Sequence, residues 1–442
     1  MRFYNRRKHP DYRILKGADI VQTPEQKVRN YIKESRIRGT RLLQKLVQEP
    51  STRGDESGAQ AVIIEKCREL GLEMDIWEIG ENGLAAHPAF CSDRKDFTGN
   101  PNAVGIMRGT GGGKSMILNG HIDVVPAGDT KDWERDPFSG HIECGKLFGR
   151  GSTDMKGGTT SLLMAMEALK NSGIKLKGDV IFQSVIEEES GGAGTLAAVL
   201  RGYKADAAII PEPTNMKLFP KQQGSMWFRI SVKGKGAHGG TRYEGVNAIE
   251  KAMLVIDRLR ILESRRNERI TDPFFESIPI PIPINIGKIH AGDWPSSVPD
   301  LAVIEGRMGV APNETQDEAK REMFEAIVEV CNEDPWLREN KPKLEWFGAS
   351  WLPGDLDPEH ELIHVLSESF MNVKEKSPLI EASPWATDGG ILSKVGGVPV
   401  VVFGPGVTET AHQANEYIKL EDVFEAAEII ALALLKWCEV SD

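Results

Sequence analysis

The chain has 442 residues, which is more than one hydrophobic core usually supports, so its length predicts at least two domains. Its 54 Lys and Arg residues and 65 Asp and Glu residues give a formal net charge of −11 at pH 7, and no basic stripe indicates a nucleic-acid partner. Residues 1–48 are the exception, with 13 Lys and Arg against 4 Asp and Glu. We interpret this arm as a solvated tail and an amphipathic first helix rather than a docking surface.

Neither a membrane partner nor secretion is expected from the sequence. It contains no apolar run of 18 residues, and its start lacks the apolar segment of a secretion signal. Five scattered cysteines without CxxC spacing are typical of reduced thiols: Cys67, Cys91, Cys144, Cys331 and Cys438. We therefore expect a cytoplasmic protein.

Helical and strand-like patterns alternate in the first half of the chain. Amphipathic patterns predict helices at about 24–48 and 57–71, and the segment 157–173 reads as a helix that ends at a glycine. Apolar runs typical of buried parallel strands are SMILNG, GDVIFQSVI, ADAAII and, much later, VPVVVFG. The alternation predicts an α/β fold with a mostly parallel central sheet.

The pattern changes after residue 223. Strand-like runs and helices at about 246–265 and 315–333 follow in the order βαββαβ, the split βαβ plan of ferredoxin-like domains. We therefore predict a first domain formed by residues 1–223 and 352–442, closed by a helix at 420–437. Residues 224–351 form the predicted insertion.

One glycine-rich segment looks like a phosphate-binding loop but lacks its context. In GTGGGKS (109–115) the first required glycine falls on Arg108, and a strand-like run follows where a helix is needed. We interpret the segment as a hairpin turn, which argues against nucleotide hydrolysis. The sequence also lacks the motifs of Ser or Cys nucleophile catalysis.

Five residues of metal-ligand type lie just beyond strand-like runs: His121, Asp154, Glu189, Glu212 and His412. In open α/β sheets, ligands bind beyond the carboxyl ends of the strands, so separate segments would deliver these side chains to one rim. Two imidazoles and three carboxylates suit two zinc-like ions that share one bridging carboxylate.

The ordered motifs resemble those of the di-zinc amidohydrolases and exopeptidases, a family that includes acetylornithine deacetylase, succinyl-diaminopimelate desuccinylase, aminoacylase-1 and carboxypeptidase G. The resemblance runs from about residue 40 to the C-terminus. It is found in HIDVVPAG (121–128), WERDPFSG (133–140), GRGSTDMKGG (149–158), EEESGGAGT (187–195), PEPT (211–214), GKGAHGG (234–240), GVNAI (245–249) and AHQANEYI (411–418). It implies a zinc-exopeptidase-like catalytic domain with an inserted lid and dimerisation domain.

The resemblance also implies roles for the metal-type residues. His121 and Glu212 would bind different metal ions, with Asp154 as the bridge, and Glu189 and His412 would complete the two sets of ligands. Zinc is the expected metal, with cobalt or manganese as alternatives.

Four further residues receive expected roles. Asp123 would accept the ring N–H of His121 through its carboxylate, and Glu188 would be the general base. His238 would reach the site of a partner subunit and stabilise the oxyanion. Arg307 would bind a substrate carboxylate, with a structural ion pair as the open alternative.

Two positions depart from the family's usual pattern. Glu187 stands where Asp is usual, and Ser296 stands where Asn often contacts the substrate. The substrate contacts are therefore open.

We expect a homodimeric two-metal hydrolase that cleaves the amide bond of an N-acyl amino acid. The first alternative is a di- or tripeptidase or carboxypeptidase of the same family acting on a short peptide. The second is a dimeric binding module without catalysis. The intact Glu188 and the five ligands argue against that last alternative.

Overall fold

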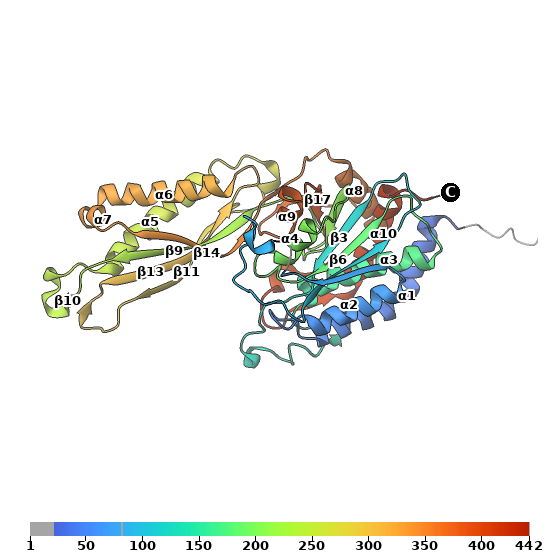
Figure 1. Ribbon diagram of the computed structural model, residues 1–442, viewed down its shortest axis with the longest axis horizontal. Coiled ribbons are helices and arrows are strands. Elements are labelled where there is room, and N and C mark those ends of the chain that lie inside the picture. The colour runs from blue at the N-terminus through green and yellow to red at the C-terminus, as the bar shows by residue number, and fades with distance from the viewer. Residues whose placement is uncertain (1–21, 81–82, 442) are drawn as a thin grey trace, which may run out of the picture.

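The structure is a computed structural model that describes residues 22–80 and 83–441. A nine-stranded sheet forms one half of the molecule, and a narrower four-stranded sheet extends from it as an arm (Figure 1). The large sheet has the order β1-β2-β6-β3-β7-β17-β8-β15, and β16 also pairs with β8. Its strands are β1 (Glu73–Glu78), β2 (Pro101–Met107), β3 (Met116–His121), β6 (Val180–Val185), β7 (Ala207–Ile210), β8 (Leu218–Gln222), β15 (Gly354–Asp355), β16 (Ile380–Ser383) and β17 (Val400–Val402).

The centre of the large sheet is parallel. Strand β3 pairs in parallel with β6 on one side and β7 on the other, and β17 pairs in parallel with β7. Every residue of these four strands is buried, because helices cover both faces of a parallel sheet. Strands β1, β2 and β15 pair antiparallel with their neighbours, so the predicted α/β class is confirmed with mixed edges.

The predicted hairpin turn at 109–115 is wrong. The segment joins β2 to β3, but β6 lies between these strands and pairs with both. The chain therefore crosses over the end of β6, a topology that local glycine content does not reveal.

Helices cover the large sheet where the sequence predicts them. The predicted helix at 24–48 is α1, which begins with a capping box formed by Thr23 and Gln26. Helix α3 packs against both α1 and α10. The helices of this half are α1 (Pro24–Gln48), α2 (Ser57–Glu69), α3 (Gly157–Asn171), α4 (Ala193–Leu200), α8 (Glu361–Lys374), α9 (Gly389–Lys394) and α10 (Leu420–Trp437).

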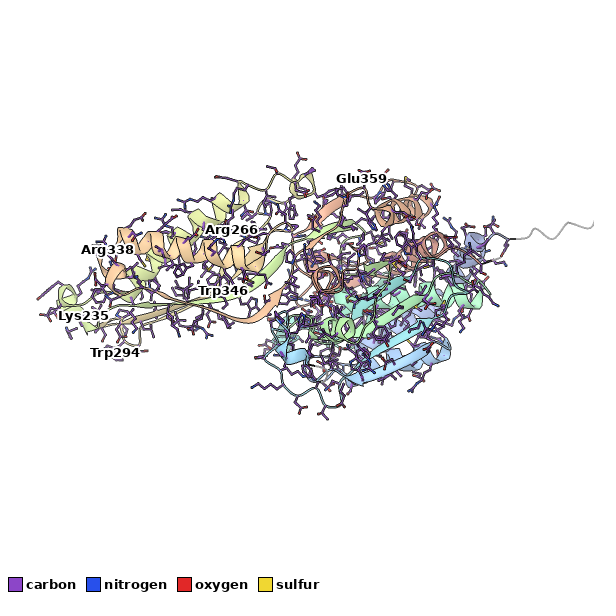
Figure 2. The ribbon with its side chains drawn as sticks, turned by 45° about the horizontal axis from the view of Figure 1, so that its top comes forward. Lys235, Arg266, Trp294, Arg338, Trp346 and Glu359 are labelled. Atoms are coloured by element: carbon purple, nitrogen blue, oxygen red, sulfur yellow. The ribbon has the colours of Figure 1, made fainter. Side chains whose placement is uncertain are left out.

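The arm has a hydrophobic core of its own. Its antiparallel sheet has the order β11-β13-β9-β14, and helices α5 and α6 pack on it (Figure 1). Buried Arg266 on α5 joins the two helices through Glu322 on α6, at 2.6 Å (Figure 2). The elements are β9 (Gly224–Lys233), α5 (Ala248–Asn267), β11 (Ile284–Ala291), β13 (Leu301–Val310), α6 (Gln316–Glu333), α7 (Pro335–Glu339) and β14 (Lys343–Trp351).

The order β9, α5, β11, β13, α6, β14 follows the βαββαβ plan. The division into domains at 223/224 and 351/352, and the lid role of the arm, stay predictions. Short elements complete the fold: β4 (His141–Glu143), β5 (Lys146–Phe148), β10 (Ala237–His238), β12 (Ser297–Val298) and β18 (Tyr417–Lys419), with short helical turns at Leu84–Ala86, Thr130–Asp132, Ser152–Lys156, Gly239–Glu244, Pro273–Phe275 and Thr408–Thr410.

Within the described ranges, no helix has the length and apolar content needed to cross a membrane. All five cysteines lie in these ranges and are free.

Candidate metal centre and active site

The five residues of metal-ligand type come together at the carboxyl ends of the parallel strands. His121 is the last residue of β3, while Glu189 and Glu212 follow the neighbouring strands β6 and β7. Asp154 lies in the turn before α3, and His412 lies in the segment after β17. The strand ends meet at one edge because β6, β3 and β7 run parallel, as the sequence analysis expected.

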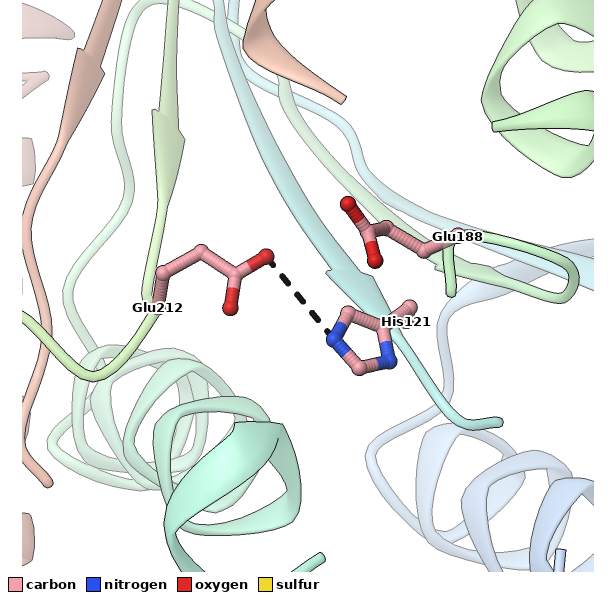
Figure 3. A group of neighbouring side chains, drawn as sticks. All are labelled: His121, Glu188 and Glu212. Carbon is pink, nitrogen blue, oxygen red and sulfur yellow. Dashed lines mark ion pairs between the residues drawn. The ribbon is translucent and has the colours of Figure 1, made fainter. Parts of the chain in front are cut away.

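Asp154 lies between the two imidazoles. Its Oδ1 is 3.2 Å from Nε2 of His121, and its Oδ2 is 3.2 Å from Nε2 of His412. Glu189 is also 3.2 Å from Nε2 of His412. Glu212 Oε1 is 3.8 Å from Nε2 of His121, the contact drawn as a dashed line in Figure 3.

The implied assignment of His121 and Glu212 to different metal ions does not agree with this geometry. The two residues face each other because they follow adjacent parallel strands, β3 and β7. His412 lies beside Glu189 instead. The distances thus favour one pair formed by His121 and Glu212 and a second formed by His412 and Glu189, with Asp154 between them.

Asp123 is buried beside His121, but its contacts differ from those expected. Its backbone carbonyl oxygen lies 2.9 Å from Nδ1 of His121, whereas its carboxylate is 3.7 Å away. The carboxylate instead accepts the backbone N–H groups of Glu188, at 3.3 Å, and Glu189, at 3.1 Å. The Asp123 backbone therefore orients the imidazole, and its side chain fixes the turn that carries the two glutamates.

Glu188 is buried and points into the same cluster as His121 and Glu212 (Figure 3). One atom from each of these three side chains lies within 4.8 Å of the other two. Glu187 contacts other partners, since its carboxylate accepts hydrogen bonds from Arg53 at 3.0 Å and Arg94 at 2.9 Å. The carboxylates of Glu187 and Glu188 therefore lie in different environments, although the two residues are adjacent in the sequence.

The backbone is in the left-handed region at two residues in or next to the cluster, Glu187 with φ 66° and His412 with φ 60°. Such conformations cost free energy in residues other than glycine and cluster at functional sites. Both residues belong to motifs that carry the family resemblance, EEESGGAGT and AHQANEYI.

Glu416 is a buried carboxylate for which the sequence predicted no role. Its Oε1 accepts the backbone N–H groups of Thr153 at 2.8 Å and Asp154 at 3.2 Å. Its Oε2 accepts Arg150 Nη1 at 2.6 Å and the Gly151 backbone N–H at 3.0 Å. Glu416 therefore holds the turn that presents Asp154. The only sequence feature that pointed to Glu416 was its position in the motif AHQANE.

The electrostatic environment of the cluster favours the binding of positive charge. Burial raises the pKa of Glu212 to about 7 and that of Glu188 well above its ordinary 4.5. Hydrogen bonds to Asp154 and Glu189 raise the pKa of His412 to about 11. Burial opposes the charged form of His121, but nearby Glu212 and Asp154 still raise its pKa well above 6.5. The protein's own groups therefore attract cations to this site.

The donor atoms also suit divalent metal ions. Two groups of side chains have the spacing of metal ligands, with one ligand atom of each residue within 4.8 Å of the others. One group is His121, Glu188 and Glu212, and the second is His121, Asp154 and Glu189. Imidazole nitrogen and carboxylate oxygen are donors that zinc accepts, and they also bind cobalt and manganese. The residues present thus fit a dinuclear centre.

A cavity of about 490 Å³ opens over the cluster. Glu188 and the ligand-type residues other than His121 line its floor. Arg307 on β13 and three tryptophans contribute to its wall: Trp227, Trp351 and Trp385. Arg307 was expected from the sequence, but the tryptophans were not, because they come from separate segments with no common motif.

His238 lies elsewhere in this chain. It belongs to β10, which Figure 1 shows at the far tip of the arm, and Figure 2 places nearby Lys235 at the same tip. Its Nδ1 accepts the Gly240 backbone N–H at 3.1 Å, and it does not line the cavity. Ser296 lies next to this segment, where its carbonyl accepts the Gly239 N–H. Neither residue joins the site within one chain.

The fold and the site together define an amide-bond metallohydrolase. The family model described as "Peptidase family M20/M25/M40" matches residues 117–436, and the chain belongs to this family. It is 34% identical over 409 residues to N-formyl-4-amino-5-aminomethyl-2-methylpyrimidine deformylase from Bacillus subtilis, covering 88% of this chain and 91% of the relative. It is 29% identical to succinyl-diaminopimelate desuccinylase from Buchnera aphidicola, covering 87% and 94% respectively.

A solved structure shares the fold. It is a dinuclear metal-binding peptidase of the M20 family from Bacillus subtilis, with a TM-score of 0.63 and 18% identity, covering 92% of this chain and 99% of that one. The expected family and the expected hydrolysis of amide bonds are therefore confirmed.

Proposed function

We propose that this chain removes a small acyl group from the nitrogen of an amine, with two divalent metal ions as cofactors. The single observation that supports this most strongly is the position of Asp154 between His121 and His412, with Glu188 facing the same cluster. The named relatives add that N-formyl and N-succinyl substrates are hydrolysed within the family. Zinc is our first choice of metal, and cobalt and manganese are the alternatives.

One ion would be held by His121, Asp154 and Glu212, and the other by Asp154, Glu189 and His412. When bound, the pair supplies Lewis-acid activation of the amide carbonyl and of the attacking water. His121 is already oriented by the Asp123 carbonyl, at 2.9 Å from Nδ1, which directs Nε2 to the cluster. Little reorganisation is then needed on binding.

Glu188 would move the proton. Its ionised carboxylate takes a proton from water as the oxygen attacks the acyl carbon, and gives it to the amine nitrogen as the C–N bond breaks. The raised pKa of Glu188 suits this second step, because a carboxyl group with a high pKa holds a proton near neutral pH. The products are a carboxylic acid and the free amine.

Since His238 lies at the tip of the arm, we propose that His238 of the partner subunit completes the site and stabilises the oxyanion. The arm, residues 224–351, would then act as both lid and dimer contact. Arg307 would contact the substrate, because its side chain forms no ion pair with any residue in the described ranges.

The test is hydrolysis by the purified full chain after metal removal and reloading with zinc, cobalt or manganese. The panel contains N-formyl, N-acetyl and N-succinyl amines, including amino acids, together with di- and tripeptides. We expect metal-dependent release of the acyl group and about two ions per chain in metal analysis. Hydrolysis of the peptides alone would favour the peptidase alternative. Absence of both turnover and bound metal would support the binding-module alternative.

A further inference from the structure

A loop of the arm reaches back to the large sheet. It consists of residues 268–281, between α5 and β11, and we call it the strap. Asn267 joins the two ends of the strap, because its side chain donates to the Ile282 carbonyl at 3.2 Å and accepts the Ile282 N–H at 2.9 Å. A loop whose ends are tied in this way is compact, so the strap follows the arm when the arm changes orientation.

The strap contacts the large sheet at two points. Oδ2 of Asp272 lies 2.6 Å from Nζ of Lys221 on β8. Further along the strap, the Ser277 hydroxyl donates to Glu381 on β16 at 3.1 Å. Lys221 also pairs with Asp355, at 3.1 Å, the residue directly opposite it on β15. A single ammonium group thus connects the strap with two strands of the large sheet.

The chain enters and leaves the arm next to Lys221. Strand β8 leads into β9 through residue 223 alone, and β14 leads into β15 through residues 352–353. A few residues at the ends of elements usually absorb a change of orientation, so a tilt of the arm turns about these two connections. The indole N–H of Trp351 donates to the Glu188 backbone carbonyl at 3.2 Å, which ties the end of β14 to the large half of the molecule.

The strap and the candidate site lie on opposite faces of the arm's sheet. On β9, Phe228 belongs to the core that the sheet shares with α5, whereas Trp227 lines the cavity over the cluster. Successive side chains of a strand point to opposite faces, so the helices and the cavity are on opposite sides. The strap follows α5, and a second cavity of about 440 Å³ beside it is lined by Arg269 and by Asn313, just before α6. The strap is therefore on the helix side.

This arrangement opposes closure of the arm over the cluster. The two connections continue β9 and β14, so they lie in the sheet, between its two faces. A tilt toward the cluster therefore moves the helix side, and the strap with it, away from Lys221. The observed orientation is open, since 53% of the His412 side chain is exposed and the arm projects away from the large half (Figure 1).

We propose that Lys221 and Asp272 form a latch that holds the arm open, and that the arm closes over the metal cluster when this ion pair separates. The inference rests on the lid role of the arm in the proposed function, but it requires no particular substrate. When the pair separates, Lys221 keeps Asp355 as its partner. The Asp272 side chain is already 28% exposed, so water can hydrate its carboxylate. Opening the latch therefore leaves neither charge buried without a partner.

The variant that tests the latch is Asp272→Asn, which removes the charge with little change in shape. Oδ1 of Asp272 accepts the Phe274 backbone N–H at 3.0 Å, and asparagine keeps this contact. Its NH₂ group then faces the Lys221 ammonium in place of Oδ2, so that two donors meet.

Asp334→Asn is the matched control. Asp334 also precedes a proline at the start of a short helical segment, and it accepts the Leu337 backbone N–H at 2.9 Å. It pairs with Lys251 at 2.6 Å, the same distance as in the latch. Both of these partners lie within the arm, so the control loses an equivalent ion pair that does not reach the large sheet.

The orientation of the arm is measured as a distance by pulsed electron paramagnetic resonance. One spin label replaces Trp294, which is 70% exposed at the tip of the arm (Figure 2). The other replaces exposed Lys131, in a turn that contacts the segment carrying His412. Attachment through non-natural amino acids leaves the five native cysteines unlabelled. Labelled, zinc-loaded full chains are mixed with an excess of unlabelled chains, so that distances are measured within one chain.

Asp272→Asn should raise the ratio of short to long distances about fivefold, because one partly buried ion pair no longer favours the open orientation. The Asp334→Asn control should keep the native distribution. Raising NaCl from about 0.05 M to about 0.5 M should also shorten the distances in the native chain, and less so in Asp272→Asn, because salt screens the pair.

Unchanged distances in Asp272→Asn, or an equal shift in the control, would overturn the latch. The distances do not depend on turnover, so the two proposals fail separately. A chain that hydrolyses acyl amines but shows no shift counts against the latch alone. A chain that shows the shift but hydrolyses none of them counts against the proposed deacylation alone.

Discussion

Replacement of Glu416 by glutamine tests how the turn that carries Asp154 is held. The substitution preserves the size of the side chain but replaces one carboxylate oxygen with an NH₂ donor. The native carboxylate accepts four hydrogen bonds, two at Oε1 from Thr153 and Asp154 and two at Oε2 from Gly151 and Arg150. In the variant, an NH₂ group replaces one of the two oxygens. Either the two donors at Oε1 or the two donors at Oε2 then face another donor in place of an acceptor.

The magnitude follows from these contacts. Each buried donor that loses its acceptor costs about 1–3 kcal/mol, and loss of the charge opposite buried Arg150 costs about 3–5 kcal/mol. These terms overlap, so we expect Glu416→Gln to lower the free energy of unfolding by about 3–5 kcal/mol. The turn also positions Asp154, so metal affinity should fall about 10–100-fold.

The assay combines urea unfolding of the metal-free chain with a metal titration of the folded chain. Glu409→Gln is the matched control, since Glu409 is exposed and, among the described residues, its carboxylate accepts a side-chain hydrogen bond only from the Asn215 amide, at 3.2 Å. The control should stay within about 0.5 kcal/mol of the native chain. A Glu416→Gln variant with native stability and native metal affinity would mean that Glu416 does not hold the turn that carries Asp154.

Three further predictions concern the chemistry. Glu188→Gln should lower kcat by at least about 10² while two metal ions stay bound, and loss of metal in step with activity would instead place Glu188 among the ligands. In calorimetric titrations, Asp154→Ala should lose both metal sites whereas Glu212→Ala should mainly weaken one; one remaining site of native affinity in the Asp154 variant would contradict the bridge. Mixed and reassembled Glu188→Gln and His238→Ala chains should recover about a quarter of native activity per site, because half of the dimers are heterodimers and half of their sites are intact. No recovery, despite exchange shown with differently tagged chains, would mean that His238 acts within its own chain.

Local signals predicted the elements of the fold well, and pairings between distant segments less well. The helix expected at 420–437 is α10, because its apolar pattern and its ends are encoded within the segment. The crossing between β2 and β3 was missed, since it depends on β6, which enters the sheet about 60 residues later. Strand order is a property of the whole sheet, and a glycine-rich connection does not determine it.

In the candidate site, too, local motifs were informative and contacts between distant segments were not predicted. Motif positions identified the ligand-type residues, but the pairing of His121 with Glu212 required the adjacency of β3 and β7. Glu416 contacts backbone N–H groups more than 260 residues away in the sequence, so no local pattern could show its role. The convergence of Trp227 with the other cavity tryptophans was hidden for the same reason.

The hydrogen bond from Trp351 to the Glu188 carbonyl has a consequence for protein engineering. The donor belongs to the last residue of β14, whereas the acceptor belongs to the turn after β6. A chimera that takes residues 224–351 from a relative, in order to change specificity, would also replace this donor. Aliphatic side chains at position 351 would leave the carbonyl without it, so exchanged arms should be chosen with Trp at that position. Without this tryptophan, an exchanged arm would change selectivity and turnover together. A screen for new substrates would then discard arms that bind the new substrate but lack the hydrogen bond to Glu188.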